Sequence, residues 1–127
     1  MYISYNPNPR GRWWAGDCVI RAIAKAEGED DWEKIYAGLS AYGFMIGDWA
    51  NNNAIWHYYL IDKGYNAYMI PNTCPRCYTI AQFAADNPKG TYILGTGRHA
   101  VAVVDGDYFD SWDSGGEVPI YYYKKEH

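Results

Sequence analysis

The spacing of apolar residues changes once along this 127-residue chain, near residue 90. Before that point apolar side chains recur every three or four positions, which is typical of amphipathic helices. After it, β-branched and aromatic residues form short runs between turn signals, which is typical of strands. The pattern predicts an α+β fold in which N-terminal helices pack on a C-terminal antiparallel β-sheet. The length suits a single domain, residues 1–127, that builds a hydrophobic core without disulfide or metal support.

The individual elements follow from the same pattern and from capping residues. Asp17 is a suitable N-cap, so Cys18 is expected in the first turn of the first helix. The first 15 residues, which contain two prolines, are expected to be irregular. The remaining predictions are helices from Cys18 to about Gly28, from about Asp31, after the asparagines 51–53 and over 79–86, and strands over 66–70, 91–97, 99–106, 107–113 and 118–125.

The Asp105-Gly106 pair separates two of the predicted strands and is a strong signal for a two-residue hairpin turn. Such a turn pairs residues whose numbers add up to 211, and paired residues lie on the same face of a sheet. His99, Asp110 and Trp112 are then expected on one face. Asp113 is expected on the other face, although a bulge or a longer turn would exchange the two aspartates.

Cys18 and His99 are the candidate nucleophile and base. A helix N-terminus lowers the pKa of a thiol, because the helix dipole and the free N–H groups stabilise the thiolate. His99 is the best base of three histidines, since His57 belongs to an aromatic helix stripe and His127 ends the sequence. Each residue also has a purely structural interpretation, a small buried thiol for Cys18 and a strand histidine for His99.

The order of these residues resembles that of the papain-like cysteine peptidases: a cysteine opening the first helix, a much later histidine opening a strand, and an acid or amide on the next strand. The stretch HAVAVVDGDYFDSWDS (99–114) is similar to the papain-type histidine strand and its Asn-Ser-Trp motif, and the Asp17-Cys18 pair resembles the bacteriocin-processing branch. The resemblance implies a papain-like hydrolase that cleaves a peptide or amide bond. Its triad would be Cys18, His99 and Asp110, with Trp112 shielding the histidine–acid contact.

Two departures from the family pattern leave alternatives open. The family usually carries a glutamine six residues before the cysteine to hold the oxyanion, and Arg12 stands there instead. Asn6 or Asn8 is a candidate substitute, and the backbone N–H of Cys18 supplies one donor. The glycine- and serine-containing signature around the cysteine is also missing. The alternatives are a catalytically inactive binding module of the same fold, or a deamidase or acyltransferase that uses the same triad.

Cys74 and Cys77 form a CPRC motif. A zinc site needs four ligands, and this is the single CxxC pair in the chain. A thioredoxin-like site needs a βαβ setting that the pattern lacks. We therefore expect a tight turn with two part-buried thiols, with metal binding and redox chemistry as lesser alternatives. No cofactor and no metal are predicted.

The charge pattern limits the partners of the protein. A formal net charge of −4, with no basic face, argues against nucleic-acid binding. The sequence contains no run of 18 apolar residues, so no membrane span is predicted, and the N-terminus lacks the apolar core of a signal peptide. These features predict a cytoplasmic protein that acts on a peptide or protein substrate. They do not predict its oligomeric state.

Overall fold

The computed structural model describes residues 1–12, 16–50 and 52–126, which form four helices and one six-stranded sheet. The predicted α+β class is confirmed. The helices are α1 (Cys18–Ala26), α2 (Trp32–Ile46), α3 (Asn53–Asp62) and α4 (Ile80–Asp86), and the strands are β1 (Tyr2–Ser4), β2 (Tyr65–Met69), β3 (Thr91–Gly95), β4 (Ala100–Val104), β5 (Asp107–Asp110) and β6 (Tyr121–Lys125).

The strands lie in the order β1-β5-β4-β3-β6-β2, and every neighbouring pair is antiparallel except β1 and β5. Strand β1 corrects the expectation of an irregular N-terminus. Its three residues pair in parallel with Tyr108, Phe109 and Asp110. Three residues are too few to produce a recognisable alternation, and the partner strand, more than 100 residues away in the chain, supplies the hydrogen bonds.

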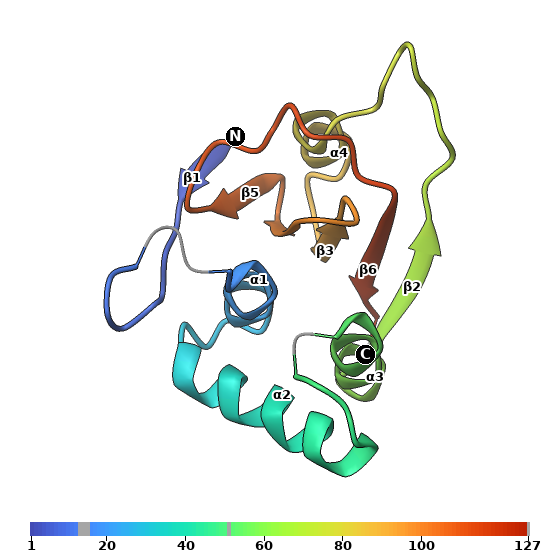
Figure 1. The fold of residues 1–127 in the computed structure, drawn as a ribbon. Coiled ribbons are helices and arrows are strands. Elements are labelled where there is room, and N and C mark those ends of the chain that lie inside the picture. Colours follow the sequence, from blue (N-terminus) through green and yellow to red (C-terminus); the bar gives the residue numbers. More distant parts are fainter. Residues whose placement is uncertain (13–15, 51, 127) are drawn as a thin grey trace.

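Helices cover both faces of the sheet, so its strands alternate between two cores (Figure 1). Ala100 and Ala102 of β4 face the larger core, which α1, α2 and α3 complete. Val101 and Val103 face the smaller core, where α4 packs. Small alanines on the first face let α1 lie close to β4, and this brings the N-terminus of α1 to the start of that strand.

Capping side chains define the starts of three helices. Asp31 accepts a hydrogen bond from the backbone N–H of Lys34 at the start of α2. Asn52 caps α3 in the same way, and Asn51 lies outside the described residues. Thr79 and Gln82 form a reciprocal capping box on α4. These starts agree with the predicted ones to within a residue or two.

The hairpin between β4 and β5 has the predicted register. Val104 pairs with Asp107, Val103 with Tyr108 and Ala102 with Phe109. Asp105 and Gly106 have φ values of 50° and 85°, as a type I′ turn requires at both central positions. Strand β3 ends at Gly95 and strand β4 begins at Ala100, so both are shorter than predicted. A tight turn in which the Thr96 N–H donates to the His99 carbonyl lies between them.

Candidate active site

Cys18 is the first residue of α1 and is partly buried. Asp17 occupies the N-cap position as predicted, but its carboxylate makes no capping hydrogen bond, which corrects the expected role of that side chain. It accepts hydrogen bonds from Arg21 at 2.9 Å, the Trp32 indole at 2.8 Å and the Asn8 amide at 3.3 Å. A charged guanidinium is a stronger partner than a backbone N–H, so the carboxylate turns toward Arg21.

His99 and Asp110 are in direct contact. The imidazole Nε2 lies 2.5 Å from Asp110 Oδ2, and Asp110 is fully buried. The Ser114 hydroxyl donates to the same carboxylate oxygen at 2.6 Å. Trp112 packs against the imidazole with 5.2 Å between ring centroids, while almost half of its surface stays exposed. A buried carboxylate on Nε2 fixes the orientation of the ring and leaves Nδ1 for a second partner.

The Cys18 thiol interacts with the same imidazole, and each group shifts the pKa of the other. Burial raises the pKa of Cys18, but a hydrogen bond from His99, another from the backbone N–H of Ala100, and the positive charges of His99 and Arg21 together lower it below its ordinary value. Burial lowers the pKa of His99, but the hydrogen bonds and negative charges of Asp110 and Cys18 outweigh this and raise it to about 9. At neutral pH the two shifts favour a thiolate next to an imidazolium.

A buried arginine connects the two acids of the site, and sequence reasoning missed it. Arg21 lies 2.9 Å from Asp17 and 3.3 Å from Asp110, with 3% of its surface exposed. Its spacing contained a usable signal, since Asp17 and Arg21 are four residues apart on one helical face. An arginine followed directly by the buried Ala22 and Ile23 is also unusual unless it is paired.

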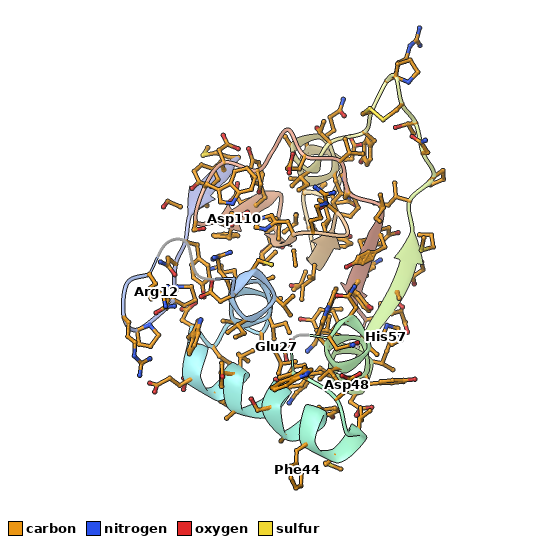
Figure 2. All side chains as sticks on the ribbon, viewed as in Figure 1. Arg12, Glu27, Phe44, Asp48, His57 and Asp110 are labelled. Carbon is orange, nitrogen blue, oxygen red and sulfur yellow. A yellow bond between two sulfur atoms is a disulfide. The ribbon has the colours of Figure 1, made fainter. Side chains whose placement is uncertain are left out.

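The other acid and the other described histidine lie elsewhere. Asp113 accepts hydrogen bonds from the Tyr108 hydroxyl at 2.6 Å and from the Gly115 N–H at 3.0 Å. His57 is part of α3, where its Nδ1 contacts the Tyr123 hydroxyl. Figure 2 shows His57 well apart from Asp110. His127 lies outside the described residues.

A cavity of about 630 Å³ opens beside Cys18 and His99. The N-terminal loop, the start of α1, helix α2, the residues around the start of α3, and the β3–β4 turn all contribute to its lining. This volume is in the range of ligand-binding clefts in proteins. The candidate nucleophile and base are therefore accessible from a space large enough for a short stretch of peptide.

The cavity also distinguishes between the candidate oxyanion donors. Asn8 lines it and is buried, whereas Asn6 turns its amide to the Arg12 carbonyl at 3.1 Å. The Asn8 side-chain oxygen accepts from the Arg10 N–H at 2.9 Å, and this orients its NH₂ group toward Asp17. An amide NH₂ carries two N–H groups, and the Asp17 contact uses one. Arg12, at the position of the family's glutamine, lines the cavity too.

The CPRC motif differs from its prediction. Cys74 and Cys77 form a disulfide in the exposed loop between β2 and α4, rather than two part-buried thiols. A separation of three residues places two cysteines within bonding distance whenever the intervening chain makes a tight turn. Within the part of the chain that the structure describes, no group of three or more histidine, cysteine or acidic side chains is arranged to hold a metal ion.

The disulfide makes a simple prediction about thiol content. The chain has three cysteines and two of them are bonded, so protein purified without reductant and then unfolded should show one reactive thiol per chain. A Cys18→Ala variant should show none, and prior reduction should restore three in the wild type. Titration with an aromatic disulfide reagent measures this directly. Three thiols in the unreduced wild type would contradict the disulfide.

Comparisons with protein-family models, with curated proteins and with solved structures find no match to this chain. No helix within the described ranges has the length and apolar character needed to cross a membrane.

Proposed function

We propose that the protein is a papain-like cysteine hydrolase that cleaves a peptide or amide bond through Cys18, His99 and Asp110. One observation carries the proposal: the His99 imidazole contacts the buried Asp110 carboxylate and lines the wall of a cavity together with the Cys18 thiol, with which it interacts electrostatically. A nucleophile, a base and a group that orients the base, in contact with one another, are the requirements for covalent acyl transfer.

The arrangement of elements supports the papain-like assignment. The nucleophile opens a helix that packs on a sheet, the base precedes a strand of that sheet, and the acid ends the next strand. Asp110 contacts Nε2 of the His99 ring, which leaves Nδ1 for the Cys18 sulfur. The histidine then has one acceptor on each side. This arrangement holds the proton donor at a fixed position relative to the sulfur.

In the first half of the proposed reaction the Cys18 thiolate attacks the substrate carbonyl carbon and forms a C–S bond. The carbonyl oxygen becomes an oxyanion, which the backbone N–H of Cys18 and the Asn8 amide stabilise. The tetrahedral intermediate then collapses and breaks the C–N bond. The imidazolium of His99 gives its proton to the departing amine, which leaves a thioester on Cys18 and a neutral imidazole.

In the second half His99 takes a proton from water, and the resulting hydroxide attacks the thioester carbonyl carbon. Breakage of the C–S bond releases a carboxylic acid and regenerates the thiolate–imidazolium pair. Asp110 holds the ring in one orientation through both halves and stabilises its positive charge. An amine in place of water would give acyl transfer, and a side-chain amide as substrate would give deamidation.

Trapping of the thioester tests this function without knowledge of the natural substrate. We expect p-nitrophenyl esters of N-acylated amino acids to give a burst of p-nitrophenol equal to the amount of protein. Intact mass should then show one acyl group on Cys18. Cys18→Ala should give neither, while the double variant Cys74→Ser with Cys77→Ser should behave like the wild type. Peptide binding without any acylation would instead support the inactive binding module.

The two aspartates near the hairpin should respond differently to the same conservative change. Asp110→Asn removes the charge next to His99, so the alkaline limb of the activity profile should move from pH about 9 toward neutrality. An opposite charge at this range accounts for about 1 to 3 pH units, and turnover at pH 8 should fall with it. Asp113→Asn should leave the profile unchanged. Equal changes in the two variants would reassign the acid.

The Asn8 amide should matter for the rate of acylation and not for the state of the thiol. Asn8→Ala removes one oxyanion donor, and such a loss typically costs about 10²–10³-fold in turnover. Asn66→Ala is the matched control, since Asn66 is exposed on β2 and does not line the cavity. Ester burst rates and the pH dependence of Cys18 alkylation measure the two effects. A rate loss accompanied by a changed thiol pKa would show a structural role instead.

A further inference from the structure

The charge of the cavity is opposite to the charge of the protein. The chain carries 15 acidic and 11 basic residues, yet the described lining of the cavity contains three arginines, Arg10, Arg12 and Arg98, and a single carboxylate, Asp17. Asp17 is buried and already bound by Arg21, Trp32 and Asn8. The charge that the cavity presents to a ligand is therefore positive.

In the part of the chain that the structure describes, Arg10, Arg12 and Arg98 make no ion pair, and all three residues are exposed. Among the other surface cations, Lys34 pairs with Glu29 and Lys125 pairs with Glu27, while Arg76 and the remaining lysines make no ion pair within the described residues. What sets the three arginines apart is therefore that they gather at the cavity. Unpaired arginines gathered at a cleft are available for an anionic ligand, which their planar groups bind in a bidentate manner.

Side-chain hydrogen bonds hold the backbone at each of these arginines. The Asn8 oxygen accepts from the Arg10 N–H at 2.9 Å, and the Asn6 amide donates to the Arg12 carbonyl at 3.1 Å. The Thr96 hydroxyl accepts from the Arg98 N–H at 3.4 Å, in the turn that leads directly into His99. Fixed backbones reduce the entropy lost when the side chains bind a ligand.

Aromatic rings form another part of the wall, beside aliphatic side chains such as Ile20 and Leu39. Trp32 stacks on Tyr36 with ring centroids 5.2 Å apart, and both line the cavity together with Trp49, which is 81% exposed, and Trp56. Such rings bind large apolar side chains with little loss of conformational freedom. The cavity therefore combines guanidinium groups for carboxylates with an aromatic surface for one bulky residue.

We propose, on the basis of the hydrolase function proposed above, that the substrate is an acidic peptide segment whose carboxylates lie close to a large apolar residue. The arginines bind the carboxylates, and the aromatic wall binds the apolar side chain. The thiolate then faces the peptide carbonyl between them. The carboxylates belong to side chains or to the C-terminus of the peptide. The positive cleft on an acidic protein also attracts such a ligand from a distance.

Binding to the Cys18→Ala variant tests this proposal independently of turnover. Fluorescence anisotropy would be measured with labelled, C-terminally amidated octapeptides in which glutamates surround one tryptophan. Matched peptides carry glutamine or lysine for glutamate, or alanine for tryptophan. A glutamine peptide with a free C-terminus separates terminal from side-chain carboxylates, and binding of either carboxylate source supports the proposal.

We expect the glutamate peptide to bind at least about tenfold more tightly than its glutamine match, because charge-assisted hydrogen bonds are lost in the latter. The difference should shrink at about 0.5 M salt. The alanine peptide should also bind more weakly than the tryptophan peptide. When the changes Arg10→Gln, Arg12→Gln and Arg98→Gln are added together to the Cys18→Ala variant, the preference for the glutamate peptide should disappear. Adding Arg76→Gln, on the exposed disulfide loop, should preserve it.

Equal binding of the glutamate and glutamine peptides, or preference for the lysine peptide, would overturn the proposal. Tighter binding of a single-stranded oligonucleotide than of the glutamate peptide would also overturn it. The two proposals fail separately. Selective binding with no ester burst in the wild type would contradict the hydrolase and leave the acidic-peptide site. An ester burst without selectivity for the glutamate peptide would support the hydrolase and contradict the acidic-peptide site.

Discussion

Replacement of Arg21 by methionine should lower the free energy of unfolding by about 3–5 kcal/mol, the usual cost of removing one partner from a buried ion pair. Arg21 lies between the Asp17 and Asp110 carboxylates, and all three side chains are buried. Methionine fills a similar volume but leaves the Asp17 carboxylate without a cation and the Asp110 carboxylate with His99 alone. Urea unfolding at pH 7 measures the loss.

A conservative variant separates charge from packing. Arg21→Lys keeps a cation between the two carboxylates, so it should lose less stability than Arg21→Met, whereas packing alone would give equal losses in the two variants. Arg76→Met on the exposed loop is the matched control and should change stability by less than about 0.5 kcal/mol. A small loss in Arg21→Met, or an equal loss in Arg21→Lys and Arg21→Met, would show that the bridge is not needed.

Replacement of His99 by alanine should reduce turnover of an activated ester by about 10²–10⁴-fold, the range for loss of a general acid and base. The variant also loses the hydrogen bond and the positive charge that lower the pKa of Cys18. The remaining activity should therefore rise with pH through the range of an ordinary thiol. The wild type should lose activity above pH about 9, where His99 gives up its proton.

His57→Gln is the control for this experiment, because His57 belongs to α3, contacts the Tyr123 hydroxyl and does not line the cavity. It should turn over the ester at the wild-type rate. If His99→Ala kept more than about a tenth of the wild-type turnover, the contact between His99 and Cys18 would have no catalytic importance.

The hairpin is the part of the site that could be predicted from sequence with the least ambiguity. Asp105-Gly106 determines the turn type, and the turn type determines the register. The register in turn places Asp110, and not Asp113, beside His99. The start of α1 could also be predicted, because an apolar helical stripe begins directly after Asp17, although the Asp17 carboxylate pairs with Arg21 instead of capping the helix. The turn residues and the apolar stripe are both local, so a local pattern is enough.

Features that depend on contacts between distant segments could not be predicted in the same way. Arg21 bridges Asp17 and Asp110, which are 93 residues apart in the chain, and nothing near Asp110 indicates a buried cation. Strand β1 exists because β5 supplies its hydrogen bonds. The placement of Asn8 in the cavity wall, with Asn6 turned to the Arg12 carbonyl, depends on how the N-terminal loop folds back on α1. Each requires the tertiary arrangement before its role is visible.

The pH dependence of Cys18 alkylation is the most direct test of the proposed active site. Iodoacetamide rates would be followed by mass spectrometry across pH 4 to 10, in the wild type and in His99→Ala. We expect the wild-type thiol to titrate below its ordinary pKa of 9.0, and the variant to titrate higher. A thiol that titrates one pH unit higher holds about tenfold less thiolate at neutral pH, so the rates should separate clearly there. Two superimposable profiles, with Cys18 titrating like a free thiol in both, would contradict the thiolate–imidazolium pair and the hydrolase built on it.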